Sequence, residues 1–246
     1  MSKQIGNIYW TNTDIINHLD SFLNIYNTRP IKNNNGGMGA PHCFATYFIL
    51  KYLNMPHIIE SGVWKGQSTW LIEKTCPNAS LICIEPNMNN IYYKSNKAQY
   101  IKNDWNTLNL TSTKDTVCFF DDHQNAVERI KHAVSKGYKH LIFEDNYPTG
   151  QGDCVSLKQS FDKNDNVTLF LEDHIEIYYE FPPVFKTKTT RWGDKWDNYP
   201  TPSPIFNTLD GNEKYKIFYD DAQNYTWLAY CLLYTSDAAD EEDSVD

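Results

Sequence analysis

Long apolar runs are absent from the 246-residue sequence. No run approaches the roughly 20 apolar residues that a transmembrane helix requires, and the N-terminal residues MSKQIGN lack the apolar core of a signal peptide. Cysteine pairs are also absent, because none of the six cysteines forms a CxxC motif. Buried thiols are therefore favoured over disulfides or a zinc site. We expect an intracellular, cytoplasmic protein with no membrane partner.

Basic residues are too few for a surface that binds nucleic acid or an anionic membrane. The chain has 22 Lys and Arg against 31 Asp and Glu, which gives a formal net charge of −9. Nucleic acids and anionic lipids favour strongly basic surfaces. A small molecule is therefore the expected partner, and no feature of the sequence indicates an oligomeric state.

The last residues of the chain, 231–246, carry part of this acidity and resemble a translated sequencing adapter. The run CLLYTSDAADE at 231–241 carries the resemblance, and 242–246 look like adjoining adapter in the same frame. We interpret 231–246 as a non-native tail and exclude it from the predicted fold, as one excludes an expression tag. An acidic, solvated terminus is the alternative.

The hydrophobic periodicity predicts an α/β fold with a doubly wound, mostly parallel sheet. Residues 13–27 and 41–53 have apolar positions at spacings of three and four, which indicates two N-terminal helices. From residue 57 onward, short apolar runs alternate with helical segments, as in repeated βα units. Strands are expected at 57–59, 81–84, 100–101, 117–120 and 140–143, and helices at 68–74 and 123–136.

The length suits a single domain. Proline-rich stretches interrupt the regular pattern after about residue 165, and the runs 215–219 and 225–230 then look like the two strands of a closing antiparallel hairpin. Residues 1–230 are therefore predicted to form N-terminal helices at 1–55, a ligand-binding core at 56–165, an insertion or lid at 166–213 and a closing hairpin at 214–230.

A glycine turn follows the first predicted strand, in the run ESGVWKGQST at 60–69. Gly62 and Gly66 let a ligand approach the backbone, since glycine has no Cβ and tolerates positive φ. The dinucleotide motif G-x-G-x-x-G and the phosphate loop G-x-x-x-x-G-K-[ST] do not fit this spacing. The helix that begins near Ser68 presents amides to a carboxylate, and Glu60 presents the opposite charge to an ammonium group. A zwitterionic ligand matches both, and a purely structural turn is the alternative.

Acidic residues end three successive predicted strands. Glu60 ends the first strand, Glu85 ends the second and Asp104 follows the third. A carboxylate at Glu85 can accept hydrogen bonds from both ribose hydroxyls, and one at Asp104 can accept from an adenine amino group. Taken singly, each acid is as well explained as a plain surface carboxylate. Together they indicate an adenosyl cofactor.

The run 58–69 resembles the first motif of class I S-adenosylmethionine-dependent methyltransferases and is most similar to the macrocin O-methyltransferase and cephalosporin hydroxylase-like group. The resemblance covers roughly residues 40–160. It implies a Rossmann-like methyltransferase sheet, with 56–165 as the cofactor-binding core and S-adenosylmethionine as the cofactor. The cofactor-binding residues that it implies are Glu60, Gly62, Val63, Gly66, Ser68, Thr69, Glu85, Asp104 and Asp121.

Hard oxygen ligands follow the fourth and fifth predicted strands, in the runs FFDDH and FEDNY. This arrangement is similar to the metal site of catechol-type O-methyltransferases, which implies Asp121, Asp145 and Asn146 as ligands of Mg²⁺ or another divalent cation. The neighbouring Asp122 and Glu144 leave the alignment ambiguous by one position. Oxygen ligands of this kind suit Mg²⁺.

Three roles are open for the residues near this edge of the sheet. A metal would lower the pKa of an acceptor hydroxyl and orient it toward the sulfonium methyl group. Alternatively, His123 acts as a general base without a metal, or it only caps the following helix. Asp121, His123 and Asp145 are the predicted catalytic residues. Further along, the run RWGDKW at 191–196 offers aromatic walls and a cation to an acceptor, although aromatic residues more often form core.

The sequence thus predicts metal-assisted O-methylation of a small hydroxylated acceptor, such as a sugar, a glycoside or a related metabolite. Nitrogen acceptors are a variant of this prediction. One alternative is a metal-dependent hydrolase or phosphoesterase that uses the Asp121 and Asp145 cluster. Another is a cofactor-binding module without catalytic activity.

Overall fold

A computed structural model describes residues 3–108, 114–163, 165–186 and 188–234. Within them lies a seven-stranded sheet with the order β3-β2-β1-β4-β5-β7-β6. Strands β1 to β5 are parallel, and β7 runs antiparallel to both β5 and β6. The strands are β1 (His57–Ser61), β2 (Ser80–Ile84), β3 (Ala98–Ile101), β4 (Thr116–Phe120), β5 (His140–Phe143), β6 (Ile175–Glu180) and β7 (Ala229–Leu233).

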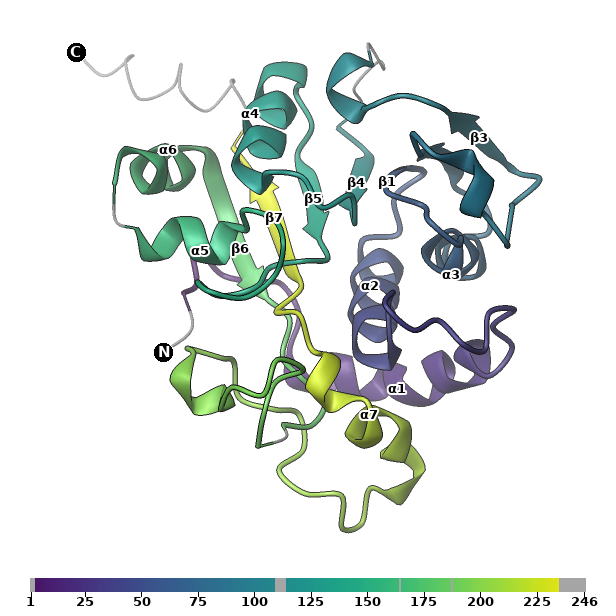
Figure 1. Cartoon of the computed structure of the whole chain (residues 1–246), viewed down its shortest axis with the longest axis vertical. Coiled ribbons are helices and arrows are strands. Elements are labelled where there is room, and N and C mark those ends of the chain that lie inside the picture. The colour runs from purple at the N-terminus through teal and green to yellow at the C-terminus, as the bar shows by residue number, and fades with distance from the viewer. Residues whose placement is uncertain (1–2, 109–113, 164, 187, 235–246) are drawn as a thin grey trace.

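Two layers of helices cover the sheet (Figure 1). One layer packs α1, α2 and α3 together, and the other packs α4, α5 and α6. No helix in the described part of the chain is long and apolar enough to cross a membrane. The helices are α1 (Asn12–Tyr26), α2 (Ala40–Leu53), α3 (Gln67–Thr75), α4 (Ala126–Lys136), α5 (Leu157–Asp162), α6 (Asn166–His174) and α7 (Lys216–Asp220).

Side chains along the central strands alternate between two apolar clusters. On β4, Val117 and Phe119 pack with the layer of α1 to α3, whereas Cys118 and Phe120 pack with the layer of α4 to α6. This division follows from the strand backbone, because successive residues face opposite sides of a sheet. A parallel strand that is covered on both faces therefore reads as a continuous apolar run in the sequence.

The predicted N-terminal helices and parallel strands are confirmed. Helix α1 begins with a capping box, in which the side chains of Thr11 and Asp14 each accept a hydrogen bond from the other residue's backbone amide. Helix α2 has Pro41 in its first turn and ends at Asn54, which is left-handed. Gly137 ends α4 with a φ of 74°, in the left-handed region. Each of the five parallel strands lies within two residues of its predicted bounds.

The predicted closing hairpin is wrong in its first strand. Residues 215–219 were expected to be extended, but most of them form helix α7. Tyr215 and Phe218 are buried at a helical spacing of three, while Tyr219 is 44% exposed. Because alternate residues in this run are also apolar, the pattern imitates a strand. The antiparallel pair at the C-terminus does exist, but β6 and β7 form it.

The predicted insertion at 166–213 begins too early. Helix α6 and strand β6 occupy residues 166–180 and belong to the sheet and its covering layer. The excursion away from the sheet runs from Phe181 to Leu228, because the two prolines after Phe181 end the strand. Helix α6 passes into β6 without a loop, so no turn residue marks the start of that strand.

The exclusion of residues 231–233 from the fold is also wrong. Cys231, Leu232 and Leu233 complete β7 and are buried. Cys231 pairs with Leu141 of β5 on one side and with Tyr178 of β6 on the other. An apolar run of this kind satisfies the N–H and C=O groups of its backbone by pairing with open strand edges. Residues 235–246 lie outside the described residues, and the resemblance to an adapter stays a prediction.

The end of β7 should contribute to stability. A chain that ends after Tyr230 loses two buried leucines, each of which contributes roughly 1.5–3 kcal/mol. Its free energy of unfolding should therefore be about 3–6 kcal/mol lower than that of a chain that ends after Tyr234. Urea unfolding followed by tryptophan fluorescence measures the difference. Equal stability of the two chains would contradict the pairing of β7 over these residues.

Candidate functional site

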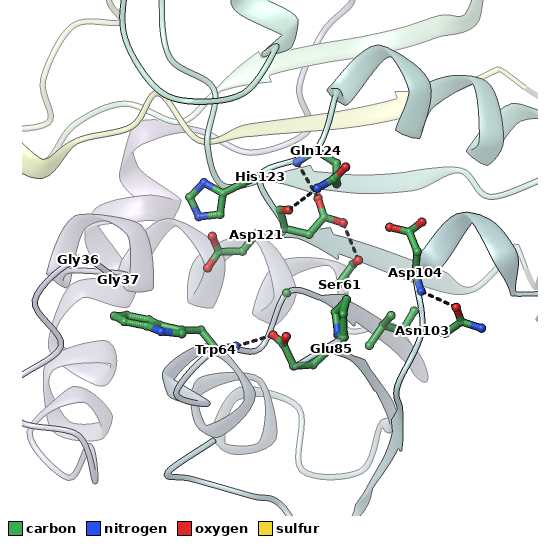
Figure 2. A pocket seen from close by; sticks show the side chains of 14 residues that line it. Gly36, Gly37, Ser61, Trp64, Glu85, Asn103, Asp104, Asp121, His123 and Gln124 are labelled. Atoms are coloured by element: carbon green, nitrogen blue, oxygen red, sulfur yellow. Dashed lines mark hydrogen bonds between the residues drawn. The ribbon is translucent and has the colours of Figure 1, made fainter. Parts of the chain in front are cut away.

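A cavity of about 380 Å³ opens at the carboxyl ends of β1, β2 and β4. Ligands of doubly wound sheets bind at this edge. Figure 2 shows the side chains of Glu85, Asp104 and Asp121 around it, each from the end of a different strand. The full lining is Gly36, Gly37, Ser61, Gly62, Trp64, Ile84, Glu85, Pro86, Asn103, Asp104, Asp121, Asp122, His123 and Gln124.

Gly62 brings the end of β1 against the end of β4. Its φ is 92°, and a Cβ there would lie 2.0 Å from the carbonyl oxygen of Asp121. Its amide donates a hydrogen bond of 3.0 Å to the carbonyl of Ile84 on β2. Gly66 precedes α3 with a φ of 90°, and a Cβ there would lie 2.1 Å from the carbonyl oxygen of Tyr93. Both positions need glycine because other backbone segments approach them closely.

The carboxylate of Glu85 holds the glycine turn in place. Its Oε2 accepts hydrogen bonds from the amides of Val63 at 3.1 Å and Trp64 at 2.9 Å, and its Oε1 accepts one from the amide of Asn87 at 2.8 Å. An ionised carboxylate offers about four acceptor positions. Glu85 therefore retains acceptor capacity toward the cavity.

Arg129 of α4 ties together the acids at the ends of β3 and β4. It is buried, and its guanidinium lies 3.1 Å from the carboxylate of Asp104 and 2.8 Å from that of Asp122. Asp122 also accepts a hydrogen bond of 2.6 Å from the hydroxyl of Ser61. The hydrogen bond from Arg129 lowers the pKa of Asp104, which favours its charged form. Sequence analysis missed Arg129, although its place on the apolar face of α4 was an available signal.

Glu60 does not line the cavity, so its predicted contact with the ammonium group of the cofactor is wrong. The side chain is fully buried, where its Oε2 accepts hydrogen bonds from the hydroxyl of Thr69 at 2.7 Å and the thiol of Cys83 at 3.1 Å. Burial raises the pKa of Glu60. Because successive strand residues face opposite ways, its neighbour Ser61 reaches the cavity instead.

Four other predicted cofactor residues also lie outside the cavity lining. The hydroxyl of Thr69 donates a hydrogen bond to Glu60, and Ser68 and Thr69 are both buried. Val63 packs its side chain into the core, and Gly66 contacts backbone. These residues support the turn from the side that does not face the cavity. The predicted cofactor residues that do line the cavity are Gly62, Glu85, Asp104 and Asp121.

A second cavity, of about 230 Å³, adjoins the first at Asp121 and His123, which line both. From the excursion after β6 it receives Arg191 and Trp192, whereas Trp196 of the same run is buried core. Its lining is Gly36, Gly37, Met38, His42, Asp121, His123, Glu144, Asp145, Tyr147, Gly152, Asp153, Arg191 and Trp192.

Asp121, His123 and Asp145 each place a potential metal-ligating atom within 4.8 Å of the others. Oδ2 of Asp145 is buried and accepts no hydrogen bond from the described residues, although Nδ1 of His123 lies 3.2 Å away. Burial raises the pKa of Asp121 well above its ordinary value, and the charges of Glu144 and Asp145 raise it further. A divalent cation would relieve this repulsion, so the residues fit a metal centre.

The two acids beside this cluster have other partners. Glu144 contacts His42 of α2 in a buried pair. Burial raises the pKa of Glu144 and lowers that of His42. Asp122 is bound to Arg129. Of these four acids, Asp121 and Asp145 are the two that face each other.

The prediction of Asn146 as a metal ligand is wrong. The residue is fully buried, and its Nδ2 donates hydrogen bonds to the hydroxyl of Tyr178 at 2.8 Å and the carbonyl of Trp227 at 3.0 Å. Its Oδ1 accepts a hydrogen bond of 2.9 Å from the amide of Lys158. The amide group therefore joins the segment after β5 to β6, to α5 and to the segment before β7. Asn146 looks like a ligand in the sequence only because it follows Asp145.

His123 takes the third place in the cluster. Its imidazole is half-exposed, with Nδ1 2.9 Å from Oδ1 of Asp153. Burial lowers the pKa of His123, but the charges of Asp145 and Asp153 outweigh this effect, so that the pKa is raised overall. The alternative in which His123 caps the next helix is wrong, because the side chain of Asn125 caps α4.

Several solved structures are similar to this chain at low identity. An apo-structure of CmcI has 16% identity and a TM-score of 0.38 over 47% of this chain and 57% of CmcI, so the chain spans little more than half of that protein. A CmcI structure with Mg and SAM has 16% identity and a TM-score of 0.43, over 60% of this chain and 68% of that one. The plantazolicin methyltransferase BpumL, in complex with a desmethylPZN analogue and SAH, has 15% identity and a TM-score of 0.45, over 91% and 93%.

No protein-family model and no curated protein matches the chain.

Gly62 and Gly150 form a matched pair of positions with which the need for glycine in the turn can be tested. Their φ values are 92° and 88°, but a Cβ at Gly150 meets nothing within 4 Å, whereas one at Gly62 meets the backbone of Asp121. Gly150→Ala should cost about 1–2 kcal/mol for the left-handed backbone. Gly62→Ala should cost about 1–3 kcal/mol more, because it adds a steric clash. Urea unfolding of both variants measures the difference, and equal losses would argue against the close approach of β1 and β4.

Proposed function

We propose that this chain is a class I S-adenosylmethionine-dependent methyltransferase. It would methylate an oxygen of a small hydroxylated acceptor, such as a sugar, a glycoside or a related metabolite, with help from a divalent cation such as Mg²⁺. The junction of the two cavities at Asp121 and His123 carries the proposal. Methyl donor and acceptor need such a junction, because the reacting atoms have to approach within about 3–3.5 Å.

The first cavity suits the adenosyl part of the cofactor. The carboxylate of Glu85 is oriented by three backbone amides, so it is already positioned to accept hydrogen bonds from ribose hydroxyls. Asp104, held by Arg129, supplies a charged acceptor for an adenine amino group. The indole of Trp64, 39% exposed beside the turn, adds an apolar wall. Because Glu60 is buried, Asp121 is the better candidate for the cofactor's ammonium group.

The second cavity suits the acceptor. Asp121 and Asp145 would hold the cation, since Mg²⁺ prefers carboxylate oxygens and retains several waters. When bound, the cation would lower the pKa of an acceptor hydroxyl. His123, at the junction of the cavities, then takes the hydroxyl proton and passes it to water.

The reaction is a single displacement at carbon. The acceptor oxygen forms a bond to the methyl carbon while the bond from that carbon to the sulfonium sulfur breaks. The products are a methyl ether, S-adenosylhomocysteine and one proton. The acids and the turn keep both partners in line for this transfer.

Binding of S-adenosylhomocysteine tests the cofactor site. Titration calorimetry should detect binding to the unchanged protein, and Glu85→Gln should weaken it about 10- to 100-fold, because hydrogen bonds to a charged acceptor contribute roughly 1.5–3 kcal/mol. Glu128→Gln is the matched control, since Glu128 is an exposed residue of α4 that does not line the cavity. Its affinity should equal that of the unchanged protein.

The alternatives give different results in the same experiment. No binding at millimolar S-adenosylhomocysteine would exclude the methyltransferase, and Mg²⁺-dependent phosphatase activity would then favour the phosphoesterase that uses the Asp121 and Asp145 cluster. Binding without methyl transfer to any pooled hydroxylated acceptor would favour the non-catalytic module.

Binding of Mn²⁺, followed by electron paramagnetic resonance, tests the metal centre. Asp145→Asn should weaken it at least about tenfold, since even indirect partners of a metal typically contribute 10- to 100-fold. Asp173→Asn is the control, because Asp173 is an exposed acid on α6 outside both cavities. Full methyl transfer by Asp145→Ala in the presence of chelator would show that the reaction needs no metal there.

A further inference from the structure

A third cavity, of about 450 Å³, opens beside the second. Gly36, Gly37, Met38 and Arg191 line both, so the two spaces adjoin. The walls of the third cavity come from the end of α1, the loop that follows it, the excursion after β6 and the turn after α7. Figure 1 shows α1 and α7 close together at the lower end of the molecule.

Three cationic side chains line this cavity: Arg29, Lys32 and Arg191. In the part of the chain that the structure describes, none of them forms an ion pair with a carboxylate. Arg29 donates a hydrogen bond of 3.1 Å to the carbonyl of Tyr26, and Lys32 donates one of 2.7 Å to the carbonyl of Asn27. Neutral carbonyls orient these groups without cancelling their charges.

Arg191 stands where the second and third cavities meet. Its Nη1 donates a hydrogen bond of 3.2 Å to the hydroxyl of Tyr147, and its guanidinium lies 4.6 Å from the centre of the Trp192 ring. Within the described residues, these contacts use one of the five guanidinium N–H groups. A guanidinium with free N–H groups binds a carboxylate or phosphate through two parallel hydrogen bonds.

The acid in this cavity, Asp221, has its own partners. Its Oδ2 accepts a hydrogen bond of 2.7 Å from the amide of Ala40, in the first turn of α2, and its Oδ1 accepts one from the side chain of Asn224. The positive end of the helix dipole stabilises the carboxylate there. The three cations therefore leave the cavity with a net positive charge.

We propose that the acceptor is an anionic molecule whose carboxylate or phosphate group binds in the third cavity, between Arg29 and Arg191. Its hydroxyl group then points into the second cavity, toward Asp121 and Asp145. The opposite charges of the two cavities admit this orientation and disfavour the reverse one, which would place an anion among carboxylates. The inference rests on the proposed function, because it names the class of acceptor for the same site.

Binding of small anions tests the third cavity apart from the methyl-transfer reaction. Inorganic phosphate and acetate serve as probes, titrated at low ionic strength in chelator so that no divalent cation binds the phosphate. At least one of the two anions should bind. Arg29→Gln and Arg191→Gln should each weaken that binding about tenfold, as the loss of a charge-assisted hydrogen bond does.

Lys131→Gln is the control variant, because Lys131 is an exposed cation on α4 that pairs with Glu128 and lines none of the three cavities. It should bind the anion as the unchanged protein does. The affinity of each variant for S-adenosylhomocysteine is measured in parallel and should stay the same, because neither arginine lines the first cavity.

The two titrations separate the inference from the proposed function. If S-adenosylhomocysteine binds but the anions do not, or bind equally to both arginine variants, the anionic acceptor is ruled out and the methyltransferase stands. If S-adenosylhomocysteine does not bind, the proposed function fails, whereas anion binding that depends on Arg29 and Arg191 still supports a cationic ligand site.

Discussion

The parallel pairing of β1 with β2 on one side and β4 on the other is the constraint on which the site depends. Ser61 pairs with Ile84 and with Phe120, so the three strands end at the same level. Gly62 follows directly and lies against the backbone of Asp121. A side chain at this position would separate the strand ends. The acids of the first cavity converge because the backbone is packed this tightly.

Charge is distributed unevenly over the three adjoining cavities. In the first, Arg129 offsets Asp104 and Asp122. In the second, Asp121 and Asp145 face each other without a lysine or arginine bound to them among the described residues. In the third, no ion pair among the described residues joins one of the cations to a carboxylate. Two carboxyl groups that face each other without a bound cation cost stability, so the pair of Asp121 and Asp145 is better explained by binding than by folding.

Most of the parallel sheet was predictable because its signals are local. The short apolar runs of the strands and the glycine turn at 62–66 each depend on only a few neighbouring positions of the chain. The last two strands were not predictable in the same way. Residues 215–219 imitate a strand but form α7, and 231–233 belong to β7 because distant strand edges are available to them.

The sequence by itself determined which strand ends carry acids and where glycine permits a tight turn. Tertiary structure decided which of two adjacent side chains faces the cavity: Ser61 rather than Glu60, and Asp145 rather than Asn146. It also brought Arg191 next to the loop after α1. For Ser61 and Glu60 the physical reason is that neighbouring residues on a strand point in opposite directions, and the direction of the core is set by helices that pack from elsewhere in the chain. Asn146 lies after β5, and its hydrogen bonds to the distant residues Tyr178 and Trp227 hold it in the core.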